Sequence, residues 1–210
     1  MRMVRSMQVE LTRQVGGGTA LTIRYPSIET ACATAEREQL MQARFAYAYL
    51  NTVYDDAGSL LEPTRDALPE SDFSTLIHPT PGDTIKDGWY LPRSNGTRVH
   101  MGTDIRSVPR KRIHSVTDGT VLYIGYMDIP GYYVVVRDPY GYEYHYYHLN
   151  ENTRFVQEGD TVRQGDVIGR VGNTGNSAAY HLHLAIVSPD GRYLNPYDLF
   201  RDAGIGPILS

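Results

Sequence analysis

Two histidines stand one residue apart in the apolar stretch YHLHLAIV, which runs from Tyr180 to Val187. On a β-strand, side chains two residues apart point to the same face. His181 and His183 are therefore predicted side by side, at positions where most strands carry Val or Ile. Two titratable rings on one face of a strand indicate a site that binds a metal or carries protons.

A second motif, HMGTD, contains His100 and Asp104 with Gly102 between them. Glycine permits a bend that lets both side chains converge on one point. Imidazole nitrogen and carboxylate oxygen are both good Zn(II) ligands. One histidine of the HxH pair would complete a His-Asp-His set and leave a fourth position open, which is the arrangement of catalytic zinc. The other histidine of the pair would then donate or carry a proton nearby.

A third motif, HYYHL, contains His145 and His148. At a spacing of three on a strand the two rings point to opposite faces, so only one of them is predicted to join His181 and His183. The period of the strand does not decide which. The imidazole that joins the site would act as a base, because its ordinary pKa of about 6.5 suits proton transfer near neutral pH.

Composition sets limits on the rest of the chain. With 41% hydrophobic and 21% charged residues it is predicted to be globular. The net charge of −4 gives no reason to expect binding to nucleic acid. The one dense basic cluster, RSVPRKR at 106–112, is predicted to be a solvated loop in preference to an anion site. No apolar run approaches the ~20 residues of a membrane span, and no signal peptide is recognised. The single cysteine, Cys32, excludes a thiolate zinc site.

The chain from His100 onward reads as short strands and tight turns, and Asp-Pro-x-Gly at 138–141 predicts a hairpin. We therefore predict a mainly β protein, with an antiparallel sheet or sandwich in a domain at 100–205. Residues 61–99 are predicted to be a loop-rich connection that begins this domain. Residues 1–60 are predicted to form an N-terminal extension with one long helix, at 27–56.

The motifs HMGTD, YYHL and HLHL, with the glycine-rich VQEGDTVRQGDVIGRVGNTGNS before the last, resemble the lysostaphin/LytM-type zinc metallopeptidases in order and spacing. The resemblance covers residues 75–200 and implies the duplicated hybrid motif fold of that family. It implies hydrolysis of peptide bonds in bacterial peptidoglycan, in the cell envelope or outside the cell. By position it implies that His100, Asp104 and His183 bind zinc, and that His148 and His181 are catalytic. It leaves open which bond is cut and the oligomeric state.

Two alternatives to this hydrolase are considered. Some relatives of the family have lost their ligands and regulate cell-wall hydrolases, but here all three ligands and both catalytic histidines are present. The run GDTVRQGDVIG also suits a histidine phosphocarrier domain. That role needs no metal-binding carboxylate, so Asp104 favours the hydrolase. The remaining histidines, His78, His114 and His145, are predicted to be structural or surface groups.

Overall fold

A computed structural model describes residues 10–13, 19–22, 34–53, 73–93, 98–151 and 155–209. The chain forms two compact units, Met1–Arg65 and Asp66–Ser210. The boundaries predicted at residues 60, 99 and 205 stay predictions.

In the first unit, the described residues form two short strands and one helix. Strands β1 (Glu10–Arg13) and β2 (Thr19–Thr22) pair antiparallel, and helix α1 spans Thr34–Val53. This helix lies inside the range predicted at 27–56, and the rest of that range lies outside the described residues. No helix in the described part of the chain combines the length and apolar character needed to cross a membrane.

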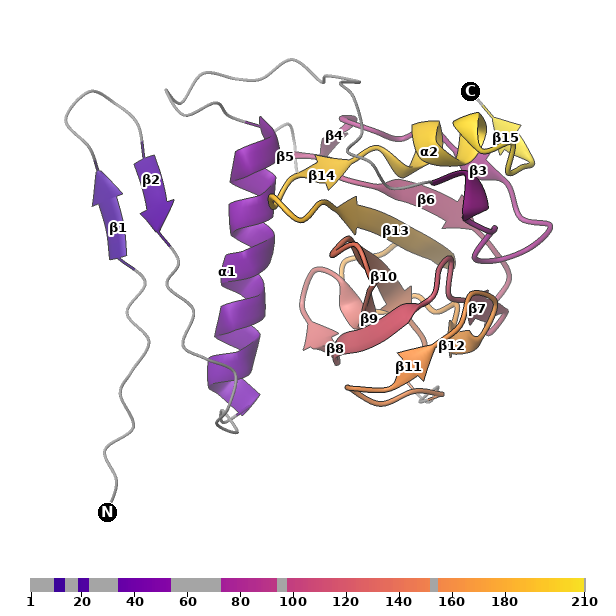
Figure 1. Cartoon of the computed structure of the whole chain (residues 1–210), viewed down its shortest axis with the longest axis horizontal. Helices are drawn as coiled ribbons and strands as arrows, with labels where there is room; N and C mark the ends of the chain where they lie inside the picture. The colour runs from indigo at the N-terminus through magenta and orange to yellow at the C-terminus, as the bar shows by residue number, and fades with distance from the viewer. Residues whose placement is uncertain are drawn as a thin grey trace. The chain divides into compact units, whose positions relative to one another are not determined.

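The second unit is mainly β, as predicted, and its long strands run side by side (Figure 1). One sheet has the order β11-β8-β9-β10-β13-β6-β3-β15, with β14 also paired to β13. Its neighbours are antiparallel except for the parallel pair β15 and β3. Two smaller antiparallel pairs, β12-β7 and β4-β5, are not part of this sheet. The elements are η1 (Phe73–Thr75), β3 (Ile85–Lys86), β4 (Pro92–Arg93), β5 (Arg98–Val99), β6 (Thr103–Arg106), β7 (Arg112–His114), β8 (Gly119–Met127), β9 (Gly131–Arg137), β10 (Glu143–Leu149), β11 (Thr161–Val162), β12 (Val167–Arg170), β13 (His181–Val187), β14 (Tyr193–Leu194), α2 (Pro196–Asp202) and β15 (Ile208–Leu209).

The predicted hairpin at Asp-Pro-Tyr-Gly is confirmed, and it joins β9 to β10. The Asp138 carboxylate accepts hydrogen bonds from the backbone N–H groups of Tyr140 and Tyr142, both at 2.9 Å. Gly141 has φ +91°, a backbone conformation that glycine adopts without strain. This turn fixes the register of β10, the strand that carries His145 and His148.

Alternation along the central strands separates a core face from a site face. Ile105 of β6, Tyr146 of β10 and Leu184 of β13 point into the hydrophobic core. Phe200 of α2 belongs to the same core and is fully buried. Asp104, Tyr147 and His183 alternate with these core residues and therefore leave the opposite face. The core thus anchors the strands from one side while the other side carries the polar residues.

Tyr146 is a core residue although it lies between the histidines of HYYHL. Its ring is fully buried and its hydroxyl accepts a hydrogen bond from the Val116 N–H at 2.9 Å. Burial raises the pKa of this phenol well above its ordinary value, so it stays neutral. Tyr146 therefore links β10 to the segment after β7.

Tyr146→Phe should lower the free energy of unfolding by about 1–3 kcal/mol, because the buried Val116 N–H loses its acceptor. Urea denaturation measures this change. Tyr140→Phe is the matched control, since Tyr140 is 70% exposed, and it should leave the unfolding free energy unchanged. Equal stability of the two variants would contradict the role given to the Tyr146 hydroxyl.

Candidate metal centre and catalytic groups

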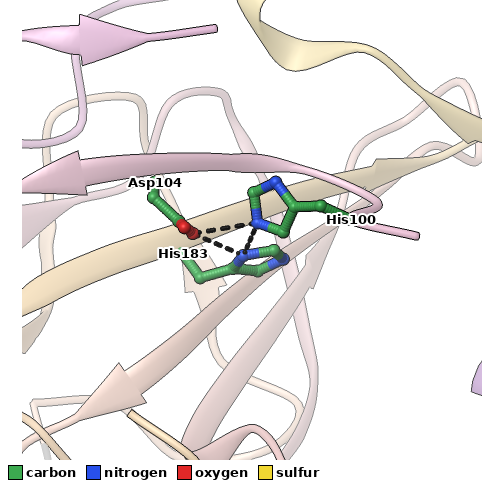
Figure 2. Close-up of side chains that lie close together, drawn as sticks. All are labelled: His100, Asp104 and His183. Atoms are coloured by element: carbon green, nitrogen blue, oxygen red, sulfur yellow. Dashed lines mark hydrogen bonds and ion pairs between the residues drawn. The ribbon is translucent and has the colours of Figure 1, made fainter. Parts of the chain in front are cut away.

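Three of the predicted site residues converge on one face of the sheet, where β6 pairs with β13 (Figure 2). Asp104 and His183 are register partners on these strands, so their side chains leave the same face. His100 precedes β6 and reaches the same point. Asp104 Oδ1 lies 3.0 Å from His100 Nε2 and 2.9 Å from His183 Nδ1, and the two nitrogens are 2.9 Å apart.

The donor atoms of this triad fit a metal cation. His100 Nδ1 lies 2.7 Å from the Gly88 carbonyl oxygen, so that nitrogen carries the proton and donates it. His100 Nε2 then directs a lone pair at the other two donor atoms. Electron-rich atoms this close together are stabilised by a cation between them, and two imidazoles with one carboxylate are a suitable set for Zn(II). Within the part of the chain that the structure describes, this is the single group of three or more His, Cys, Asp or Glu residues with such geometry.

Electrostatics keep two of these ligands unprotonated at neutral pH. Burial opposes ionisation of Asp104, but the close ring nitrogens of His100 and His183 favour the ionised carboxylate and hold its pKa well below the ordinary value. Asp104 Oδ2 also accepts a hydrogen bond from Arg93 Nη2 at 2.9 Å. Burial lowers the pKa of His183 to about 4, against the opposing effect of its hydrogen bond with Asp104. Protons therefore compete weakly for these two ligands near pH 7.

His148 reaches the site through an irregularity in β10. Tyr147 is the register partner of His183, and His145 is the partner of Ala185, so strict alternation would put His145 on the site face and His148 in the core. The pairing of β10 with β9 shifts register between Tyr146 and Leu149, and His148 has φ +61°. This bulge turns the His148 ring toward the site, where it lies 4.7 Å from the His181 ring and 6.1 Å from the His183 ring, centroid to centroid.

Thr174 holds this bulge in place. The His148 backbone N–H donates to the Pro130 carbonyl at 2.7 Å, and His148 Nδ1 donates to the Thr174 carbonyl at 2.8 Å. The Thr174 hydroxyl donates to the Leu149 carbonyl at 2.7 Å and accepts from the Tyr132 N–H at 3.0 Å. A strained non-glycine φ persists only where the surroundings fix it, and these four bonds do so.

The second non-ligand histidine, His181, is also held by a carbonyl. Its Nδ1 lies 2.9 Å from the Ala179 carbonyl oxygen and its Nε2 lies 3.6 Å from Asp104 Oδ1. In both His148 and His181 the Nδ1 atom carries the proton, which leaves Nε2 as a proton acceptor. Burial lowers the pKa of His148 to about 4, and the neighbouring His181 adds to this shift. The two rings beside the triad are thus oriented as bases.

Tyr147 supports His183 from behind and was not predicted from the sequence. Its ring stacks on the His183 ring with centroids 5.4 Å apart and an interplanar angle of 5°. Its hydroxyl lies 2.8 Å from His145 Nδ1, His145 Nε2 lies 3.2 Å from Glu143 Oε2, and Arg137 donates to Glu143 at 2.6 Å. Burial raises the pKa of Tyr147 well above its ordinary value, so the ring stays neutral against the ligand.

The three remaining histidines lie away from the triad. His145 is buried in the network just described. His114 Nδ1 lies 2.7 Å from the Gly165 carbonyl oxygen, and His78 Nδ1 accepts from the Thr80 N–H at 3.1 Å. Besides Tyr147, the sequence interpretation missed Arg93 and Thr174, whose roles depend on loop and bulge geometry rather than on a spacing that can be read from the sequence.

The part of the chain that contains the site is similar to a known family. Residues 98–196 match the sequence model of peptidase family M23. This range contains the five predicted site residues, His100, Asp104, His148, His181 and His183. Residues 98–196 form a peptidase family M23 domain. The catalytic domain of lysostaphin from Staphylococcus simulans has the same fold, with a TM-score of 0.50 and 23% identity over 57% of this chain and 92% of that domain.

Curated relatives of the M23 domain carry peptidase names. Peptidoglycan DD-endopeptidase ShyC of Vibrio cholerae is 33% identical over 105 residues, which are 50% of this chain and 24% of that protein. DD-carboxypeptidase/endopeptidase Mpg of Neisseria meningitidis is 34% identical over 142 residues, 68% of this chain and 29% of that protein. The chain thus spans about a quarter of the length of these relatives.

The pKa values predict how the metal-free protein titrates. In NMR titration, the ring protons of His148 and His183 should change shift with midpoints near pH 4, because burial favours the neutral rings. The unfolded chain, with ordinary pKa values, binds more protons between pH 6.5 and 4. Stability should therefore rise with pH across this range and be lost as pH falls through it. Midpoints near 6.5 for both rings would contradict the burial argument.

Thr174→Val should lower the free energy of unfolding by about 1–3 kcal/mol, because the Leu149 carbonyl and the Tyr132 N–H lose their partner. It should also shift the His148 ring resonances, since the bulge is loosened. Thr174→Ser keeps the hydroxyl and serves as control in the same urea denaturation and NMR spectra. If the valine variant matched the serine variant in both measurements, Thr174 would not be holding the bulge.

Proposed function

We propose that this chain is a zinc-dependent endopeptidase that hydrolyses peptide bonds in bacterial peptidoglycan. The observation that carries the proposal is the convergence of the His100, Asp104 and His183 donor atoms beside two carbonyl-oriented imidazoles. A ligand triad alone would suit a structural metal as well. Two further bases next to an incomplete ligand set support catalysis.

His100, Asp104 and His183 would hold the metal through Nε2, Oδ1 and Nδ1 respectively, the atoms that face one another. Bound zinc would supply a Lewis acid that polarises the scissile carbonyl and activates a water for attack. Arg93 keeps the Asp104 carboxylate oriented through its second oxygen. Tyr147 limits rotation of the His183 ring by stacking on it.

His148 and His181 would move the protons of the reaction. The low pKa of His148 keeps it neutral at pH 7, with Nε2 free to accept a proton from the attacking water. Neutral His181 presents an acceptor at Nε2, because Nδ1 donates to the Ala179 carbonyl. Once His181 is protonated, the same nitrogen becomes a donor that can stabilise the tetrahedral oxyanion. The two rings lie close together, with centroids 4.7 Å apart, so both can take part in proton transfer at one substrate.

Peptidoglycan as the substrate is supported by the similarity to ShyC of Vibrio cholerae, which is named a peptidoglycan DD-endopeptidase. The cell envelope or the space outside the cell is where such a substrate would be met. A regulatory module without activity is disfavoured because all three ligands and both bases are present. A phosphocarrier is disfavoured because Asp104 lies within the histidine group.

The roles separate in two variants. His183→Ala should lose both zinc and hydrolysis, because a ligand is gone. His148→Ala should keep zinc but lower kcat by about 10²–10⁴-fold, because a general base is gone. The measurements are zinc content of the purified protein and release of peptides from purified peptidoglycan, with and without a chelator.

His114→Ala is the matched control, because His114 lies on β7 away from the triad. It should keep both zinc and hydrolysis. Hydrolysis that survives full removal of the metal would refute the proposed mechanism. Loss of zinc in His148→Ala would show that the division between ligand and base is wrong.

A further inference from the structure

Two exposed cations border Asp104 on the site face. Arg106 follows Asp104 by two residues on β6 and is exposed, while Ile105 between them and Thr103 before Asp104 are buried. Arg106 is also the register partner of His181. On the other side of β6, Lys86 of β3 is the register partner of Asp104 and is exposed. Register partners share a face, with Cβ atoms ~4.5–5.5 Å apart, so both cations stand next to the site residues.

Neither cation is neutralised by a side chain in the described part of the chain. The third cation of this region, Arg93, is bound to Asp104 Oδ2 at 2.9 Å. Asp87, next to Lys86 in the chain, accepts from the Trp89 N–H in its own turn. No hydrogen bond, ion pair or ring contact of the described residues involves the Arg106 guanidinium or the Lys86 ammonium. The site therefore carries excess positive charge, although the chain as a whole has a net charge of −4.

We propose that Lys86 and Arg106 form a carboxylate-binding subsite that selects peptides with a free carboxylate beside the scissile bond. A guanidinium binds a carboxylate through two parallel hydrogen bonds, and an ammonium adds a point charge. Both groups project from paired strands, which hold them more firmly than a loop would. The sequence interpretation treated Arg106 as part of a solvated basic loop, but Arg106 ends β6, and the loop begins after it.

This subsite rests on the proposed peptidase function and narrows its substrate class. A peptide that keeps a carboxylate on the residue next to the cleaved bond would place that charge between Arg106 and Lys86. An uncharged bridge of glycine residues would leave both cations without a partner. The subsite thus favours cleavage within carboxylate-bearing stem or cross-link peptides over cleavage of a neutral glycine bridge.

The test uses two synthetic peptides that differ in one group, a free carboxylate or its amide on the residue beside the scissile bond. The zinc-loaded full chain should cleave the carboxylate peptide with a kcat/KM about 10- to 100-fold higher, the range expected for a charged hydrogen bond. Arg106→Gln and Lys86→Gln should each reduce this ratio, and the double variant should bring it close to 1. Arg163→Gln, which removes an exposed arginine just after β11, should keep the wild-type ratio.

Binding measured without turnover separates this inference from the proposed function. In NMR titrations of the metal-free protein, the carboxylate peptide should bind more tightly than the amide, and the double variant should remove the difference. Carboxylate-dependent binding without any cleavage by the zinc-loaded protein would refute the peptidase function and keep the subsite. Equal binding and equal cleavage of the two peptides would overturn the subsite.

Discussion

Asp104 and His183 face each other across β6 and β13, and the arrangement of the site depends on this register. A slip of one residue in β6 would turn Asp104 into the core and bring Ile105 to the site face, and a slip in β13 would do the same to His183 and Leu182. The buried apolar residues that alternate with Asp104 on β6 and with His183 on β13 therefore also determine the register. They specify which face each polar residue takes, so the core determines the geometry of the candidate metal centre.

The grouping of His100 and Asp104 with one histidine of the HxH pair could be predicted from the residues, and the choice of His183 followed from the family resemblance. The route of His148 to this group could not be predicted. Alternation correctly put His181 and His183 on one face and allowed His100 and Asp104 to meet. Applied to β10, alternation alone does not decide between His145 and His148. Combined with the observed register it would select His145, because a regular strand gives no sign of the bulge at His148. The resemblance to a known family, rather than the period, selected His148. The bulge depends on two hydrogen bonds with Thr174, which accepts from His148 and donates to Leu149. Thr174 lies far away in the chain, so no local pattern reveals these bonds.

The local features of the fold could be predicted from the sequence, but its long-range arrangement could not. A mainly β domain and the hairpin at Asp138 followed from β-branched runs and turn residues, which act locally. The order of strands in the sheet is a long-range property, and so is the support of His183 by Tyr147. A tyrosine in a strand is ordinarily a packing residue, and here its partner across the sheet makes it part of the site. The proposed carboxylate-binding role of Arg106 is also a long-range property, because it depends on the pairing of Arg106 with His181 across the sheet.

The most direct test is anomalous diffraction at the zinc absorption edge from crystals of the zinc-loaded protein. We expect one zinc peak bound by His100 Nε2, Asp104 Oδ1 and His183 Nδ1, with the His148 and His181 rings close to it but not coordinated. A zinc ion coordinated by His148, or the absence of zinc from this triad, would contradict the account.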